Sequence, residues 1–157
     1  FGKTLGDTVL AVGGAPTKMS GSKQFLAYQR GTVDAGMTGI TAVKSRKLFE
    51  VMDYMTLTYN ADIEFIVVIN EKVWQGLSEK ERAVVSKAGL RVEKELRDKM
   101  GAIEQGVLEW SRDKIKVVDL TDAERNLWRE ATKSVVNGYV ERSGDLGKFI
   151  VEEAAKL

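Results

Sequence analysis

A long helical pattern in the second half of the chain constrains its fold more than any other feature. Ser78 and Glu81 form a Ser-x-x-Glu capping box, in which each side chain bonds the backbone N–H of the other. From there, apolar residues recur every three or four positions as far as Trp110. The pattern predicts one helix that ends near Asp113 and is roughly 50 Å long. Because this exceeds the width of a small domain, we expect the helix to cross from one lobe to another.

The apolar stripe along this helix has two interpretations. Plain core packing is the first. The second is a helical protein-interaction module, in which the amphipathic helix 79–113 pairs with a partner helix. Two other apolar runs, Val33–Met37 and Phe65–Ile69, have strand length. They favour the first interpretation, because strands need a sheet that a coiled-coil module lacks.

Residues 32–38 form the stretch in which we expect a ligand-facing strand. Val33, Ala35 and Met37 alternate with polar or small residues, which is typical of a strand with one buried face. Thr38 then precedes a helix that begins near Ile40. The first N–H groups of a helix have no internal partner, so a small polar residue there can belong to a ligand platform. An ordinary strand–turn–helix connection explains the same spacing.

The remaining pattern predicts an α/β fold. A continuous apolar run, Phe65–Ile69, indicates a strand buried on both faces. Thr121 and Glu124 form a second capping box before another helix. Further elements are a short helix capped by Ser20 or Ser22, strands at Tyr54–Thr58 and Ile115–Val118, and a break at Ser143–Asp145.

Composition excludes several classes of function. The 157 residues are 43% hydrophobic and 30% charged, with a net charge of +1, which gives no strong field for nucleic acid. The sequence has no Cys and no His, so thiol nucleophiles, Ser-His-Asp triads and the usual zinc ligand sets are absent. No phosphate-binding loop and no apolar run long enough to span a membrane is present. We therefore predict no catalytic residues, no cofactor and no metal.

An ordered set of short motifs points to a family. It consists of the turn Gly13–Pro16, then Met19, Phe25, Gln29–Ala35, Lys47–Val51, Tyr54, Leu57–Thr58, Asn70, Trp74 and Leu77, with Val117 and Leu120 toward the end. In this order the motifs resemble the C-terminal half of the solute-binding receptors of tripartite ATP-independent periplasmic (TRAP) transporters. The resemblance covers essentially the whole chain, and no single motif is diagnostic.

The resemblance implies the C-terminal half of a two-lobed, type II-like periplasmic binding protein. Residues 1–62 and 105–157 would belong to the second lobe, and 63–104 would return through the first lobe and begin the long helix. The implied function is capture of a small organic acid in the periplasm and its delivery to a membrane permease, without catalysis. The Arg that pairs with the ligand carboxylate in that family is expected upstream of Phe1. A chain lacking that upstream part is expected to self-associate.

The resemblance also implies ligand-binding positions. Thr38 stands where the family often has an Asn that bonds the ligand carboxylate, and Gly21 stands where a pocket Phe is frequent. These departures leave room for a bulkier ligand. Asp62 and Phe65 fall near positions where some members contact ligand or metal. The predicted substrate-binding residues are Ser20, Gly21, Met37, Thr38, Asp62 and Phe65.

Overall fold

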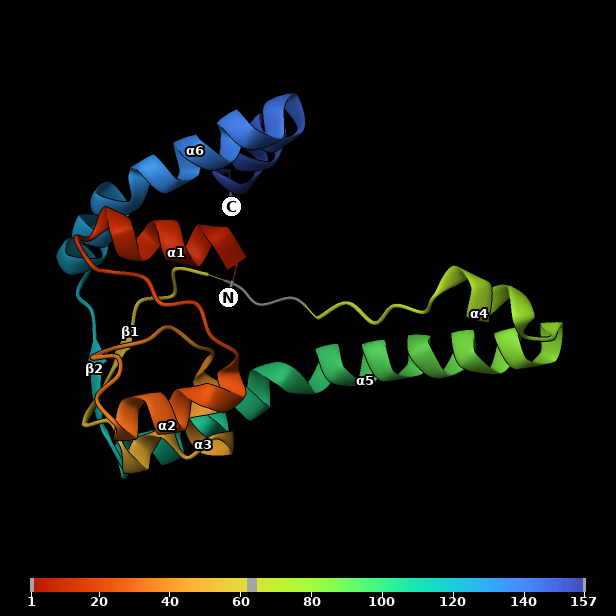
Figure 1. Cartoon of the computed structure of the whole chain (residues 1–157), viewed down its shortest axis with the longest axis horizontal. Coiled ribbons are helices and arrows are strands. Elements are labelled where there is room, and N and C mark those ends of the chain that lie inside the picture. Colours follow the sequence, from red (N-terminus) through yellow and green to blue (C-terminus); the bar gives the residue numbers. More distant parts are fainter. Residues whose placement is uncertain (1, 62–64, 157) are drawn as a thin grey trace.

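A computed structural model describes residues 2–61 and 65–156, and most of these residues are helical. Ten elements are defined in the described part of the chain, and Figure 1 shows their arrangement. In chain order they are α1 (Gly2–Ala11), the 3₁₀ turn η1 (Gly21–Lys23), α2 (Gln24–Gln29), α3 (Ile40–Ser45), the 3₁₀ turn η2 (Leu48–Glu50), β1 (Tyr54–Leu57), α4 (Glu71–Gly76), α5 (Glu79–Arg112), β2 (Lys116–Asp119) and α6 (Asp122–Ala154).

The predicted long helix is confirmed as α5, which has 34 residues. Its capping box forms as expected, because Ser78 Oγ accepts from the Glu81 N–H and the Glu81 carboxylate accepts from the Ser78 N–H. These bonds lower the pKa of Glu81 below its ordinary value, first through the Ser78 hydroxyl and then through the Ser78 N–H. Both ends of the box satisfy donors that the helix itself leaves without partners.

The C-terminal end of α5 packs against α3 and the 3₁₀ turn η2. The Trp110 ring meets the Phe49 ring edge to face, with centroids 4.9 Å apart, and Lys44 Nζ lies 4.9 Å from the Trp110 centroid. Such aromatic and cation–π contacts add to ordinary burial. The buried apolar residues are Ala42, Val43, Leu48, Leu57, Ile115 and Val135. Most of this core therefore joins α3, η2 and the end of α5 to the small sheet.

The sheet consists of β1 and β2, which pair in parallel with Tyr54 opposite Lys116 and Leu57 opposite Asp119. Both strands were predicted, and both are confirmed within a residue or two. The connection between them contains α4 and α5, which agrees with the rule that parallel strands need a long crossover. Arg112 at the end of α5 donates two hydrogen bonds to the Asp119 carboxylate, at 2.7 and 2.9 Å.

Two predicted strands are wrong within the described residues. Residues 32–38 run from a bend into an extended loop, and Phe65–Ile69 has no strand assignment. The reason is the same in both cases, because a strand exists only where a neighbour accepts and donates its backbone hydrogen bonds. The described part of the chain pairs only β1 with β2. The side chains of Phe65–Ile69 are 46–97% exposed, so the run predicted to be buried lies open.

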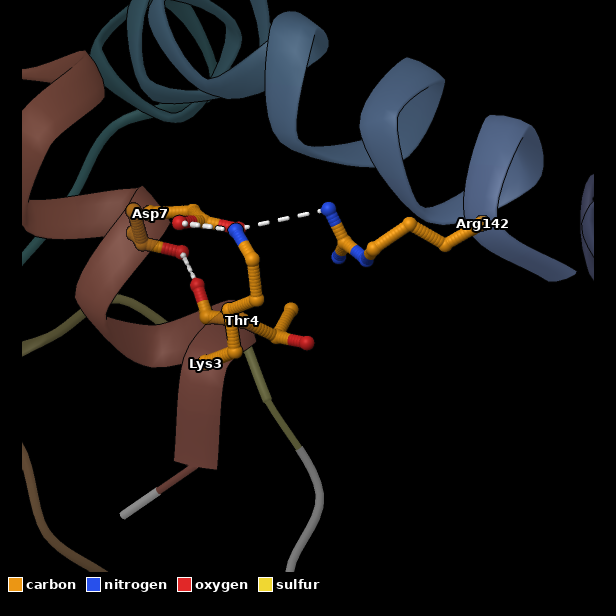
Figure 2. Close-up of polar contacts among 5 residues, drawn as sticks. Lys3, Thr4, Asp7 and Arg142 are labelled. Atoms are coloured by element: carbon orange, nitrogen blue, oxygen red, sulfur yellow. Dashed lines mark hydrogen bonds and ion pairs between the residues drawn. The ribbon is translucent and has the colours of Figure 1, made fainter.

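Helix α6 begins at the second predicted capping box, in which Thr121 Oγ1 accepts from the Glu124 N–H. The predicted break appears as a kink at Gly144, whose φ of 58° and ψ of −145° are not helical. Helix α1 packs beside α6 (Figure 1). An ion pair links the two helices, with Arg142 Nη1 3.5 Å from Asp7 Oδ2 (Figure 2).

The chain has an elongated shape because one arm extends from the rest. Figure 1 shows α4 and the first turns of α5 far from the sheet and from α6. Along this arm the apolar stripe of α5 is open to solvent, and Val85, Val92 and Ile103 are 44–54% exposed. Core packing within the chain, the first interpretation of the stripe, therefore holds only near Trp110.

Candidate functional site

Four polar side chains and one glycine meet where η1, α2, the loop 32–38 and the end of α3 come together. Gln24 begins α2 and is buried, with 6% of its surface exposed. Arg46 directly follows α3 and is half-buried. Its Nη1 donates to Gln24 Oε1 at 2.7 Å and to Thr38 Oγ1 at 3.1 Å. Gln24 Nε2 in turn donates to the Met37 carbonyl oxygen at 3.4 Å. The guanidinium thus ties the loop to both helices.

Gly21 provides the space in which the Arg46 guanidinium lies. A Cβ at position 21 would lie 2.3–2.4 Å from Cζ, Nη1 and Nη2 of Arg46. No real Cβ approaches other atoms so closely, so a side chain at position 21 would displace the guanidinium. The absence of a side chain at this buried position therefore determines where the arginine charge sits.

Tyr28, also on α2, approaches the loop 32–38 at Gly36. A Cβ on Gly36 would lie 2.0 Å from the Tyr28 hydroxyl oxygen, so the loop approaches the ring where it has no side chain. Burial raises the pKa of Tyr28, and the nearby Arg46 charge partly opposes that change. At neutral pH the hydroxyl therefore keeps its proton and can donate or accept a hydrogen bond.

The cluster carries a net positive charge. Within the residues described, no carboxylate lies within 4.0 Å of the Arg46 nitrogens, and no hydrogen bond involves its Nε or Nη2. A guanidinium has five N–H donors, and the two bonds to Gln24 and Thr38 use those of Nη1. The arrangement is suited to binding an anion, because the described residues leave the other three N–H donors of this partly desolvated cation without a hydrogen bond.

The structure brings together some of the predicted site residues and separates others. Gly21, Met37 and Thr38 all lie in the Arg46 cluster. Ser20 is exposed beside it, with its Oγ 3.0 Å from Ser22 Oγ and no capping bond to the backbone of η1. Phe65 is 87% exposed, and no hydrogen bond that the structure gives for the Arg46 cluster involves it. Asp62 lies outside the described residues. The binding roles of these residues stay predictions.

Sequence reasoning missed Gln24, Tyr28 and Arg46. Arg46 sits within the basic run Lys44–Lys47, which reads as a solvated helix end. The sequence has a glycine at position 21 where an aromatic is frequent in the family it resembles, but nothing local shows which side chain fills the space. Arg46 and Gln24 are 22 positions apart, so their contact depends on the tertiary fold.

Other classes of site are not seen in the described part of the chain. No group of three or more acidic, His or Cys side chains there could hold a metal ion. None of the helices that the structure describes has the length and apolar character needed to cross a membrane.

The fold is that of half of a TRAP periplasmic solute-binding protein. A galacturonate complex of such a protein from Bradyrhizobium superposes with a TM-score of 0.84 and 21% identity, covering 100% of this chain and 51% of that one. An L-malate complex from Pseudomonas aeruginosa gives a TM-score of 0.81 and 20% identity, covering 87% of this chain and 48% of that one. The predicted fold class is therefore confirmed.

The sequence defines the family more closely. Residues 2–143 match the family described as "Bacterial extracellular solute-binding protein, family 7", and the chain belongs to that family. The sialic acid-binding periplasmic protein SiaP of Vibrio cholerae is 26% identical over 145 residues, which are 92% of this chain and 44% of that protein. The ectoine/5-hydroxyectoine-binding periplasmic protein UehA of Ruegeria pomeroyi is 23% identical over 152 residues, or 95% of this chain and 45% of that protein. The chain thus spans about half the length of these curated relatives.

Proposed function

We propose that this chain is the ligand-binding C-terminal part of an extracytoplasmic receptor. The receptor captures a small organic acid and delivers it to a TRAP-type membrane permease. The observation that carries the proposal is the match of fold over the entire chain to solute-binding proteins that hold organic acids, galacturonate among them. The half-buried Arg46, whose remaining N–H donors are available, agrees with an anionic ligand. The relatives are named as periplasmic proteins, which supports the same location for this one.

The exposed apolar side chains support a division of the chain between two lobes. Residues 1–62 and 105–157 supply the second lobe, which contains the sheet and the Arg46 cluster. Residues 63–104 pass through the first lobe, and this accounts for the open apolar run Phe65–Ile69 and the open stripe on α5. Both need an apolar partner to be stable in water. The same open surfaces support self-association when the first lobe is lacking.

Within the cluster we assign ligand contacts to Thr38, Met37 and Gly21, with Ser20 at its exposed border. Asp62 and Phe65 belong to the segment that enters the first lobe, and their assignment rests on the resemblance alone. The family consists of solute-binding proteins, which agrees with a receptor that releases its ligand unchanged. The extent of the match favours this function over a helical interaction module built on residues 79–113.

A thermal-unfolding screen of the full-length receptor with small organic acids tests the function. A ligand at 100 times its dissociation constant adds about 2.7 kcal/mol to the free energy of unfolding. We expect at least one acid to raise the melting temperature, and the uncharged methyl ester of that acid to have little effect. If no acid in a broad panel stabilises the protein, or if a bound acid is chemically converted, the receptor proposal fails.

A further inference from the structure

The exposed side of α2 carries an apolar hollow between two cations. The hollow has a volume of about 360 Å³. Leu26, which belongs to its lining, is 48% exposed. An apolar hollow with a charged rim is typical of an interaction site. We call it the α2 groove, and its lining consists of Met19, Lys23, Leu26, Ala27, Arg30 and Thr32.

The α2 groove is separate from the Arg46 cluster, although both use the same helix. Gln24 and Tyr28 are one turn apart, and they are the α2 residues that are buried or half-buried at the cluster. Lys23, Leu26 and Arg30 follow one another at intervals of three and four, and all three are exposed. Residues at these intervals share one face of a helix. Helix α2 therefore presents one face to the cluster and another to the outside.

The positive charge of the α2 groove is not neutralised by the part of the chain that the structure describes. Within residues 2–61 and 65–156, no carboxylate lies within 4.0 Å of the side-chain nitrogens of Lys23 or Arg30. No acidic residue is part of the lining either. Positions seven residues apart on a helix are separated by roughly 10 Å along its axis. A complementary occupant therefore has two negative charges at about that spacing, with apolar side chains between them.

A protein segment matches this pattern better than a lipid surface does. Binding to anionic lipid is typical of clusters of roughly four to eight Lys or Arg residues. The α2 groove has two cations, and the net charge of the chain is +1. A concave apolar surface accommodates the side chains of a helix or loop, and Met and Arg are both enriched where proteins meet.

We propose that the α2 groove is a docking surface for an acidic amphipathic segment of the membrane permease. This inference rests on the proposed function, in which the receptor delivers its ligand to a permease. Apolar side chains of the segment fill the hollow beside Met19 and Leu26. Two carboxylates, about two helical turns apart, pair with Lys23 and Arg30. The opposite charges speed the encounter and fix the orientation of the receptor, and the apolar contact slows its release.

Binding of the full-length receptor to the purified permease in nanodiscs of zwitterionic lipid tests the proposal. Biolayer interferometry measures the affinity at low and high salt, with and without an acid that stabilises the receptor in the thermal-unfolding screen. The double variant Lys23→Glu/Arg30→Glu places like charges together. We expect it to lower the affinity by roughly a hundredfold or more and to remove the salt dependence. Leu26→Ser should lower the affinity about tenfold at either salt concentration.

Two control variants separate the α2 groove from a general effect of charge. Arg129→Glu/Lys133→Glu reverses two exposed cations of α6 and makes the same change in net charge, so it should leave permease binding unchanged. Lys23→Arg/Arg30→Lys keeps both charges and should keep the affinity. The substituted side chains of the α2 groove are exposed and lie outside the Arg46 cluster. Each variant should therefore keep the melting temperature of wild type and its stabilisation by the acid.

Several results would overturn the docking proposal. Permease binding that the Lys23→Glu/Arg30→Glu variant leaves intact is one, and a loss that the α6 control reproduces equally is another. A wild-type receptor that binds its acid but not the permease also overturns it. Nanodiscs of anionic lipid without permease are a further probe, and binding to them that the double variant abolishes would assign the α2 groove to lipid instead. If no acid stabilises the receptor, the receptor function itself fails, so the two failures are distinguishable.

Discussion

Replacing two residues of the open apolar run Phe65–Ile69 should have a different effect in the isolated chain and in the full-length receptor. Ile66 and Val68 are both 82% exposed in the 157-residue chain. Full burial of such a side chain stabilises by about 1.5–3 kcal/mol. Replacing both by Ser therefore removes about 3–6 kcal/mol wherever the run is buried. In the isolated chain the burial would occur between copies, and in the full-length receptor it would occur against the first lobe.

We expect the isolated chain to self-associate and the Ile66→Ser/Val68→Ser variant to weaken that association. Since about 1.4 kcal/mol corresponds to a tenfold change, the dissociation constant should rise by two to four orders of magnitude at most. Sedimentation velocity over a range of concentrations measures it. In the full-length receptor the same substitutions should lower the free energy of unfolding in urea by a similar amount.

Leu127→Ser is the matched control, because Leu127 is 71% exposed on α6 and far from the run in sequence. It should change neither quantity appreciably. A wild-type chain that stays monomeric at every concentration would refute the reasoning for the isolated chain. Full-length receptor that keeps its stability in the double variant would refute the proposed passage of residues 63–104 through the first lobe.

Smaller effects are expected elsewhere. Ser78→Ala should lower the free energy of unfolding by about 1 kcal/mol in a urea titration, since it removes the cap of α5; an unchanged midpoint would contradict this. The lowered pKa of Glu81 means that its contribution is full above the ordinary pKa of glutamate, about 4.3, and is lost as pH falls through the lower folded value. Glu81→Gln should therefore flatten the acid limb of stability against pH, and an unaltered limb would count against the box. Ser111 is fully buried, and its hydroxyl has no hydrogen-bond partner in the described residues, so Ser111→Ala should raise the melting temperature or leave it unchanged, never lower it. Asp7→Asn should cost about 1 kcal/mol, and the cost should shrink at high salt, because it weakens the pairs of Asp7 with Lys3 and Arg142, which are both partly open to solvent.

Helix ends were predictable because their determinants are local. Ser78 with Glu81, and Thr121 with Glu124, each place both members of a capping box within four residues. The kink at Gly144 follows in the same way, since only glycine adopts its positive φ at little cost. No distant partner is needed for these features, so a pattern in the sequence is sufficient to find them.

Strands were predicted less well because a strand depends on its neighbour. Tyr54–Leu57 and Lys116–Asp119 meet each other and form a ladder. The run Phe65–Ile69 has equally strong β-forming residues and forms none within the described residues. Alternation and apolar content indicate how well a segment fits a sheet. They carry no information about whether a neighbouring strand is present to pair with it. The same limit applies to residues 32–38.

The Arg46 cluster shows why the candidate site was only half predictable. At position 21 a glycine stands where a large residue is frequent, and this predicts empty space for a bulkier ligand. The structure fills that space with the guanidinium of Arg46, held by Gln24 and Thr38. The guanidinium occupies the space that a side chain at position 21 would need, in keeping with the close packing of protein interiors. Here the neighbour is a cation, so loss of bulk at position 21 becomes a gain of positive charge in the site.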